Sequence, residues 1–547
     1  MNELSTAATS NLAEAVFKKF IWSERANYIW TSRANLLKTL SYDKIDEIIF
    51  GRRHFMLNDF VGPQTNMDDA AIKAEKNRFQ DEIVSLLQPL KESKIPIVVL
   101  IEGWDSSGKA TLISELASKI DPRFFSVFTE KSDVIGTERY PFIYPYFKAI
   151  PEGGKILFMD SGWLQRIVDD DLHGNTDAKE KAARINSINI FERQLKNDGY
   201  IVLKFFINIS EKKQRKAQEY LLSDKNTKFR VTDDDKYQNK HYDKFQKAYD
   251  EVMEATTVHP WHILDGDHKK LEVYEAFRIF YNTINDAIKA GKYNGEPYEE
   301  EFPMYSPAPR LENADLSAKL AKEDYEVELK RLQKSIKKLH GALYRKKIPM
   351  VICYEGWDAG GKGGNIRRLA KPLDPRGFDT YPIASPLPPE KSRHHLWRFW
   401  TKVPKSGHIA IFDRTWYGRV MVERLEGFCT ENDWKRAYNE INEFEKELHD
   451  AGAIIVKFWI QIDKETQLER FTDRQNTPSK QWKITDEDWR NREKWDLYEG
   501  AISEMIEKTS TEYAPWFIIE SVDKYYARIK ALKIVEAAMK YAIGETK

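Results

Sequence analysis

Hydrophobic and polar positions follow two different periods along this chain, and the same succession of periods occurs twice. Residues 71–90 carry apolar side chains three and four positions apart, which predicts an amphipathic helix, and the apolar run "IPIVVLI" follows at residues 95–101. Residues 324–343 repeat the helical pattern ahead of the apolar run "MVICY". Short apolar runs that alternate with helical segments predict parallel strands with helices on both faces of the sheet.

The two successions are copies of one another. Gly103 and Gly356 are 253 positions apart, and the same offset relates Asp160 to Asp413 and "VLKFFI" to "IVKFWI". An offset held over more than a hundred residues indicates a tandem duplication. The sequence therefore predicts an α/β fold with domains at residues 71–290 and 321–547, a linker rich in Pro, Gly and Glu at 291–320, and an N-terminal helical extension at 1–70.

A glycine-rich loop follows the first strand of each copy. In the second copy "EGWDAGGKGG" (355–364) fits G-x-x-x-x-G-K through Gly356, Gly361 and Lys362, whereas Gly363 stands where Ser or Thr would hold a magnesium ion. A strand, a tight turn and a helix present backbone N–H groups and a positive dipole end to an anion. We expect a P-loop that binds phosphate; the alternative is a simple glycine-rich turn.

Two carboxylates are expected to replace the absent hydroxyl. Asp413 ends the apolar run "HIAIF", where P-loop enzymes hold magnesium, and Asp358 lies inside the loop. Oxygen ligands suit a hard cation, so we expect Mg²⁺ as the cofactor, with Asp358 and Asp413 as its ligands. The alternative for Asp358 is that it caps the following helix.

Overall composition excludes several classes of function, and local charge suggests another. The 86 Lys and Arg balance 86 Asp and Glu, which argues against bulk binding to nucleic acid or to anionic membranes. Two cysteines build no disulfide framework, and no segment resembles a signal peptide, so we expect a cytoplasmic protein. Residues 367–424, however, hold twelve Lys or Arg against five Asp or Glu, whereas 114–171 hold seven against ten.

The basic residues of the second copy are expected to form a track for a long polyanion. They stand beside the P-loop and are lost selectively from the first copy, where Arg367, Arg414 and Arg424 become Ser114, Ser161 and Asp171. The alternative is a solvated surface. A later helical segment is also basic and is expected to close over the phosphates. The phosphate-binding candidates are Gly356, Gly361, Gly363, Arg367, Arg368, Arg376, Arg393, Arg398, Arg424, Arg470 and Arg474.

The motifs "EGWDAGGKGGNIRRL", "LDPRGF", "LWRFW" and "FDRTWYGRVMVERLEGF" resemble the second family of polyphosphate kinases. The resemblance implies P-loop domains akin to thymidylate kinase, each with a helical lid. The tandem arrangement resembles the two-domain subgroup, which implies Mg²⁺-dependent phosphoryl transfer from inorganic polyphosphate to AMP, giving ADP, in the C-terminal domain. It assigns the transferring phosphoryl group to Lys362, Arg414 and Arg419, the metal and the acceptor to Asp358 and Asp413, and a supporting role to Glu423.

The first copy keeps only part of this motif set. It retains Asp105, Lys109, Asp160 and Arg166 but lacks the Arg after the strand-end Asp. We expect a degenerate domain that serves packing or substrate funnelling; a second active site of different preference is the alternative. For the whole chain, an ATP-dependent kinase of a nucleotide or small metabolite and a non-catalytic polyanion-binding protein stay open, as does a homo-oligomer.

Overall fold

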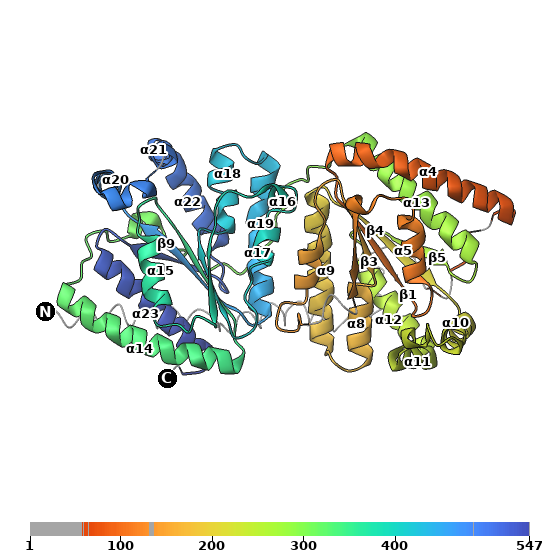
Figure 1. Ribbon diagram of the computed structural model, residues 1–547. Coiled ribbons are helices and arrows are strands. Elements are labelled where there is room, and N and C mark those ends of the chain that lie inside the picture. Colours follow the sequence, from red (N-terminus) through yellow and green to blue (C-terminus); the bar gives the residue numbers. More distant parts are fainter. Residues whose placement is uncertain (1–56, 58–59, 64, 131–135, 485, 546–547) are drawn as a thin grey trace, which may run out of the picture.

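The computed structural model describes residues 57, 60–63, 65–130, 136–484 and 486–545 (Figure 1). Most of the N-terminal extension expected at residues 1–70 therefore lies outside the described residues. Two five-stranded sheets form, each with parallel strands, and their orders are β2-β3-β1-β4-β5 and β7-β8-β6-β9-β10. The predicted fold class, two tandem α/β P-loop kinase-like units, is confirmed.

The first sheet stands within helices on both faces. Its strands are β1 Ile97–Gly103, β2 Phe125–Thr129, β3 Ile156–Asp160, β4 Ile201–Asn208 and β5 Trp261–Asp265. The helices of this half are α4 Asp69–Ser93, α5 Lys109–Ala117, α7 Tyr144–Ala149, α8 Trp163–Leu172, α9 Ala178–Asn197, α10 Glu211–Ser223, α11 Asp233–Lys240, α12 Tyr242–Ala255 and α13 Lys269–Ala290.

The second half repeats this arrangement, and most elements keep the offset of the sequence repeat. Its strands are β6 Met350–Gly356, β7 Phe378–Pro382, β8 Ile409–Asp413, β9 Ile454–Gln461 and β10 Trp516–Glu520. Its helices are α14 Lys322–Lys346, α15 Lys362–Ala370, α16 Pro388–Lys391, α17 Trp397–Trp400, α18 Val422–Leu425, α19 Glu431–Asp450, α20 Lys464–Asn476, α21 Asp486–Glu493, α22 Trp495–Thr509 and α23 Lys524–Ala542.

The central strands are buried on both faces, as their continuous apolar runs require. Every residue of β1 is buried, and β6 is buried up to Gly356. Each sheet also encloses one buried ion pair, Lys204 with Glu192 at 2.9 Å and Lys457 with Glu445 at 2.8 Å. In both halves the lysine ammonium donates a further hydrogen bond of 2.7 Å to a threonine carbonyl, so the buried charges are fully partnered.

The two halves are joined side by side through packed helices (Figure 1). α9 of the first half packs on α19 of the second, and α7 packs on α17. The rings of Phe147 and Trp400 stack at 5.2 Å, and Gln194 donates to Glu443 at 2.7 Å across the junction. One hydrophobic cluster runs through both halves, so they share a core. Within the described residues, no helix combines the length and the apolar character that crossing a bilayer requires.

Candidate active site

Both halves place a glycine-rich loop at the carboxyl edge of the sheet, next to a strand-end aspartate. In the second half β6 runs into the loop and α15, and the neighbouring β8 ends at Asp413. Parallel strands bring these ends together at one edge. A cavity of about 580 Å³ opens there, and its wall includes Asp358, Gly361, Lys362, Gly363, Asp413, Arg414, Arg474, Trp482 and Asn491.

The backbone of this loop needs its glycines. Gly356 has a φ of 145°, and a Cβ built there would lie 2.5 Å from the carbonyl oxygen of Ile460. Gly361 precedes α15 with a φ of 118°, which L side chains rarely adopt. The two positions turn the chain from strand to helix within a few residues, so the N-terminus of α15 faces the cavity.

Lys362 holds its ammonium at the mouth of the loop. The Nζ atom donates to the carbonyl oxygen of Gly356 and, at 3.3 Å, to that of Trp357. The side chain thus folds back over the loop, next to the backbone N–H groups that would receive a phosphate. This is the placement expected of a P-loop lysine.

Asp358 is held from both sides. Its Oδ1 accepts from Arg414 at 3.1 Å, and its Oδ2 accepts from Asn491 at 3.1 Å. Burial alone would raise the pKa of Asp358, but Lys362 and Arg414 together keep the pKa below its usual range. Asp358 therefore stays ionised at neutral pH, and Asn491 fixes its orientation.

Asn491 escaped the sequence analysis, as did Gln467, which donates to the Asp358 carbonyl oxygen at 3.1 Å. Both come from the helical segment after β9, more than a hundred positions from the loop. At the repeat offset of 253, Gln467 matches Gln214 and Asn491 matches Gln238, so the internal repeat was the signal that could have found both. The fold then brings the two amides to Asp358.

The turn after β8 is tied to the strand before the loop. Thr415 donates its backbone N–H and its hydroxyl to Glu355 Oε1, at 2.7 and 2.8 Å. This bond positions Arg414, whose φ is 65°. One turn further on, Arg419 pairs with Glu423 at 3.1 Å, and neither residue is part of the wall of the 580 Å³ cavity.

Two of the expected phosphate-binding arginines donate hydrogen bonds to backbone carbonyl oxygens of the loop. Arg470 donates to the carbonyl oxygens of Ala359 and Gly360 at 3.0 and 2.8 Å, and its other nitrogen donates to two carbonyls after β10. Arg368 donates to the Gly364 carbonyl oxygen at 3.1 Å. Arg474 lies in the cavity wall, and Arg367 is exposed on α15.

The remaining basic candidates do not converge on the loop. Arg393 donates to the Ile150 carbonyl oxygen at the junction with the first half, and Arg398 donates to Ala384. Arg424 pairs with Glu504 at 2.6 Å. Arg376 precedes β7, so it lies at the opposite edge of the sheet from the loop. A single track through all the expected arginines is therefore not what the fold builds.

The loop of the first half has the same backbone but a different lining. Asp105 accepts from Gln165 at 3.1 Å, and its backbone N–H donates to Gln238 at 2.8 Å. Lys109 folds onto the carbonyl oxygen of Gly103 at 3.0 Å, as its counterpart does. Gln238 is the counterpart of Asn491, whereas Gln165 stands at the position of Gly418 and brings to this loop an amide that the second loop lacks.

Charge in the first site is altered as well. Arg166 lies 3.8 Å from Glu130, and that carboxylate occupies the position of Ile383 in the second half. Asp160 ends β3 as expected, but Ser161 follows it where the second half has Arg414. The first site has therefore gained an acid and lost a cation, which disfavours a phosphate ligand.

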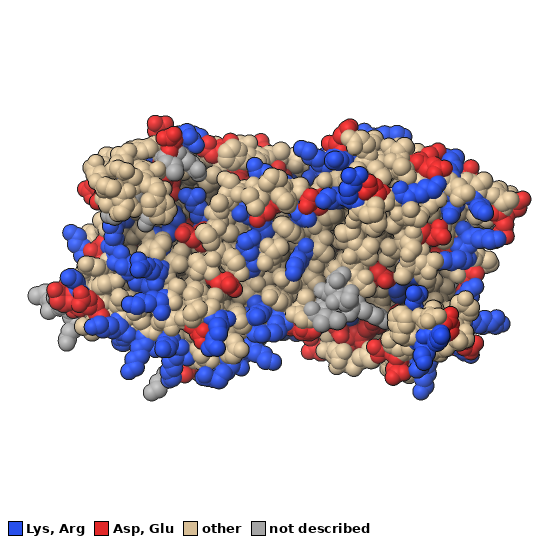
Figure 2. Space-filling model, viewed as in Figure 1, with Lys and Arg blue, Asp and Glu red and all other residues tan. Residues whose placement is uncertain are grey.

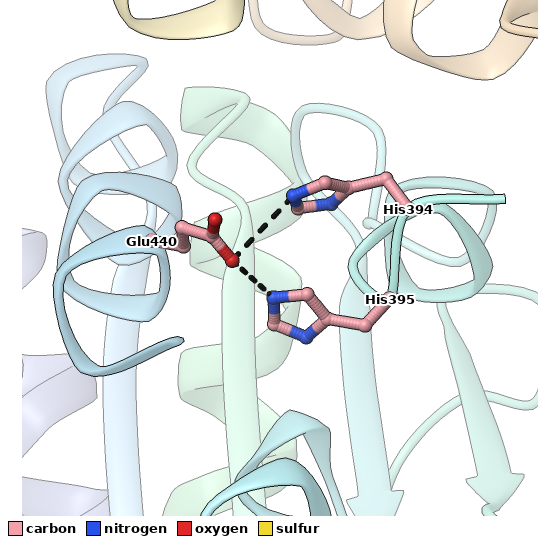
Figure 3. Close-up of side chains that lie close together, drawn as sticks. All are labelled: His394, His395 and Glu440. Carbon is pink, nitrogen blue, oxygen red and sulfur yellow. Dashed lines mark hydrogen bonds and ion pairs between the residues drawn. The ribbon is translucent and has the colours of Figure 1, made fainter. Parts of the chain in front are cut away.

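Among the described residues, one group of side chains comes close enough to share a metal ion away from the loops: His394, His395 and Glu440 (Figure 3). Burial lowers the pKa of His395 to about 3, so its neutral ring hydrogen-bonds to Glu440 at 2.6 Å. Arg436 donates to the other oxygen of Glu440 at 3.1 Å. Arg436 already balances the charge of the Glu440 carboxylate, so we interpret the group as a structural contact between α19 and the segment before α17.

Comparison with known proteins places this geometry in context. The profile of the family described as Polyphosphate kinase 2 (PPK2) matches residues 66–292 and 319–547. The polyphosphate:AMP phosphotransferase of Pseudomonas syringae pv. tomato is 36% identical over 497 residues, which are 88% of this chain and 98% of that protein. Its namesake from Pseudomonas aeruginosa is 34% identical over 488 residues, 86% of this chain and 98% of that one.

A solved structure assigned to polyphosphate kinase 2 of Pseudomonas aeruginosa superposes with a TM-score of 0.76. It is 32% identical in sequence, and the match covers 89% of this chain and 99% of that one. The similarity therefore extends through both halves and their arrangement.

Proposed function

The chain belongs to the polyphosphate kinase 2 family, and from this premise we propose that it transfers a phosphoryl group from inorganic polyphosphate to AMP, giving ADP, in the site of its C-terminal half. The observation that carries the proposal is the cavity at the second loop, where Asp358, Lys362, Asp413 and Arg414 meet. Full-length relatives named for this reaction support the choice of donor and acceptor.

The side chains of this site divide the work by charge. Lys362, the N-terminus of α15 and Arg414 surround the position of the transferring phosphoryl group, whose oxygens carry most of the charge in the transition state. Phosphoryl transfer needs little covalent help, so fixed cations form most of the catalyst. Arg474 lies in the same wall and can bind the donor chain. Arg419 and Glu423, which pair next to the site, position the segment that carries Arg414.

Asp358 and Asp413 have different surroundings and, we infer, different roles. Both oxygens of Asp358 already accept hydrogen bonds, from Arg414 and Asn491. The carboxylate of Asp413 lines the cavity, and no ion pair or side-chain hydrogen bond engages it within the described part of the chain. Asp413 therefore fits a magnesium ion best, and Asp358 fits the orientation of Arg414 and of the acceptor. Bound at Asp413, Mg²⁺ would neutralise phosphate charge.

The reaction is tested by supplying Mg²⁺, long-chain polyphosphate and AMP without ATP and measuring ADP. A parallel assay offers ATP as the only donor. ADP formation in the first assay supports the proposal. Activity with ATP alone would replace it by the ATP-dependent nucleotide or metabolite kinase, which needs a compact donor site.

The metal assignment is tested with Asp413→Asn. The variant should need a higher Mg²⁺ concentration for half-maximal rate and lose about 100-fold in kcat, because a neutral amide is a poor ligand for a hard cation. Asp160→Asn in the first half is the matched control and should behave as wild type. An unchanged magnesium dependence of Asp413→Asn would remove Asp413 from the metal site.

A further inference from the structure

A second cavity opens at the opposite edge of the C-terminal sheet, where no reaction has been assigned. It measures about 920 Å³ and lies between the end of α14, the segment from α15 to β7, and the segment before β8. The cations in its wall are Arg139, Lys337, Arg345, Lys371, Arg376 and Lys405, and we call this set with its cavity the basal cationic pocket.

Charge in the basal cationic pocket is almost entirely of one sign. Among the described residues of its wall, Asp374 is the only carboxylate, and it is paired with Arg376 at 2.8 Å. Within the described residues, no ion pair engages Lys337, Arg345 or Lys371, although salt bridges form on α14 and α19 of the same half. Figure 2 shows Lys and Arg gathered at the lower left, over the region where α14 lies. Like charges held around a concavity raise its potential and attract an anion.

Hydrogen bonds through His340 fix the turn that forms one wall of the pocket. His340 Nδ1 accepts from the Asp374 backbone N–H at 3.2 Å, and its Nε2 lies 3.3 Å from the Gly377 carbonyl oxygen. A Cβ at Gly377 would lie 2.6 Å from the same ring nitrogen. Burial lowers the pKa of His340, so the neutral ring donates to one side of the turn and accepts from the other.

The first half, which shares the fold, carries less net positive charge at this edge. Lys337, Arg345, Lys371 and Lys405 are replaced by Val84, Glu92, Ser118 and Glu152, and Arg123 matches Arg376. Lys91, Lys119 and Lys155 stand at the positions of Tyr344, Pro372 and His408, but Lys119 pairs with Asp81 and Lys155 pairs with Glu152 at 3.3 Å. A basic surface kept merely for solubility has no reason to carry its excess of unpaired cations in the half with the intact P-loop. Arg139 of the first half nevertheless reaches this pocket and donates to the Ser406 carbonyl oxygen.

α15 connects the basal cationic pocket with the phosphate loop. The helix begins at Lys362 in the loop and ends at Ala370, next to Lys371 in the pocket. Gly363, Arg367 and Lys371 are spaced four residues apart and so lie along one face of the helix, which is about 13 Å long. Arg367 is exposed between the two cavities. A flexible polyanion can therefore run from one cavity to the other past Arg367.

We propose that the basal cationic pocket binds the distal part of a long inorganic polyphosphate chain while its reacting end occupies the phosphate loop. The proposal rests on the proposed function for the identity of the polyanion. Binding at two places on one chain raises the effective concentration of the reacting end at the loop. A donor shorter than α15 reaches the loop only and gains nothing from the pocket.

The test is the double variant Arg345→Glu/Lys371→Glu, with Lys216→Glu/Lys225→Glu as its matched control. The control makes the same change of charge on exposed lysines of the first half. The KM for long-chain polyphosphate should rise about tenfold in the pocket variant, because two attractive contacts become repulsive. The KM for tripolyphosphate, the KM for AMP and kcat should match wild type.

Equilibrium dialysis against long-chain polyphosphate without AMP provides a second readout that needs no turnover. The pocket variant should lose affinity by the factor seen in KM, and the control should not. Equal losses in both variants would assign the effect to the overall field, and an equal rise in KM for tripolyphosphate would assign the residues to the reacting site; either result overturns the proposal. If the wild type binds polyphosphate but forms no ADP, the proposed function is rejected. The dialysis comparison of the pocket variant with its control then still decides whether the pocket binds polyphosphate.

Discussion

The two halves of this molecule share a backbone and differ in what fills the space in front of the loop. Ala359 and Ser106 have φ values of 59° and 62°, and Arg414 and Ser161 have 65° and 61°. The turns that present a phosphate site are thus kept where the phosphate cations are lost. In the first half Gln165 reaches Asp105, whereas Gly418 leaves the matching position of the second half open.

This difference shows that the loop motif alone does not make the site. A strand, a turn and a helix produce the same loop in both halves, because the local sequence dictates it. The residue that follows the strand-end Asp by five positions, Gln165 in one half and Gly418 in the other, decides whether a further protein group reaches the loop aspartate. Function therefore depends on residues that the motif does not contain.

The largest effect is expected from the lysine of each loop. Lys362→Ala should lower kcat by about 10,000-fold if, as we propose, the ammonium stabilises the charge that develops on the transferring phosphoryl group. Lys109→Ala is the matched variant and should change kcat by less than about twofold, since its loop is occupied by protein groups. ADP formation from polyphosphate and AMP measures both. A large loss in Lys109→Ala would mean that the first half also carries out the reaction.

The next effect concerns a feature that both halves keep. Lys457→Met and Lys204→Met should each lower the free energy of unfolding by about 3–5 kcal/mol, because each leaves a buried glutamate without its counter-charge. Denaturant unfolding of the two variants should give similar losses. Adding Glu192→Gln to Lys204→Met should recover part of the loss. If only Lys204→Met has a small effect, the buried ion pair of the first half contributes less to stability than its counterpart in the second half.

The acid before each loop gives a pH-dependent contrast. Burial raises the pKa of Glu102 to about 8, whereas the unfolded chain titrates near 4.5. Between these values the folded state holds a proton that the unfolded state has released, so the contribution of Glu102 to stability is highest below pH 4.5 and falls as pH rises to 8. The loss should approach about 4 kcal/mol by pH 8.

Glu102→Gln removes this titration and should flatten the decline. Urea unfolding of wild type and variant at pH 5, 6.5 and 8 measures it. Glu355, the counterpart, also has a raised pKa from burial, but it accepts two bonds from Thr415. Glu355→Gln should therefore flatten the curve less. Parallel pH curves for wild type and Glu102→Gln would contradict the assignment.

The smallest effect is expected when the glutamine that reaches Asp105 in the first site is introduced at the matching position of the second site. A Cβ at Gly418 meets no atom within 4 Å, so the backbone there has room for a side chain to start. Gly418→Gln should reach Asp358 as Gln165 reaches Asp105 and lower kcat about tenfold by competing with Arg414 and the substrate. Gly418→Ala is the control and should stay near wild type. If both variants lose activity equally, backbone freedom and not occupation of Asp358 explains the glycine.

The sequence by itself determined the repeat, the parallel sheets, both loops and the strand-end aspartates. These features follow from hydrophobic period and from glycine positions, which act within a few residues and leave a local pattern. The predicted helix at 71–90 is contained in α4, and the expected Asp413 ends β8.

Only the tertiary structure decided which polar groups reach the loop. Gln238 meets Asp105 and its counterpart Asn491 meets Asp358, each across 133 positions, but Gln238 accepts from the Asp105 backbone N–H whereas Asn491 donates to the Asp358 carboxylate. The arginines expected to form one track lie apart in the structure. Arg376 is at the opposite edge of the sheet from the loop, and Arg393 is at the junction between the two halves. A sequence shows which residues are charged. Packing between distant segments decides where each charged side chain points, and local hydrophobic periodicity carries no information about that packing.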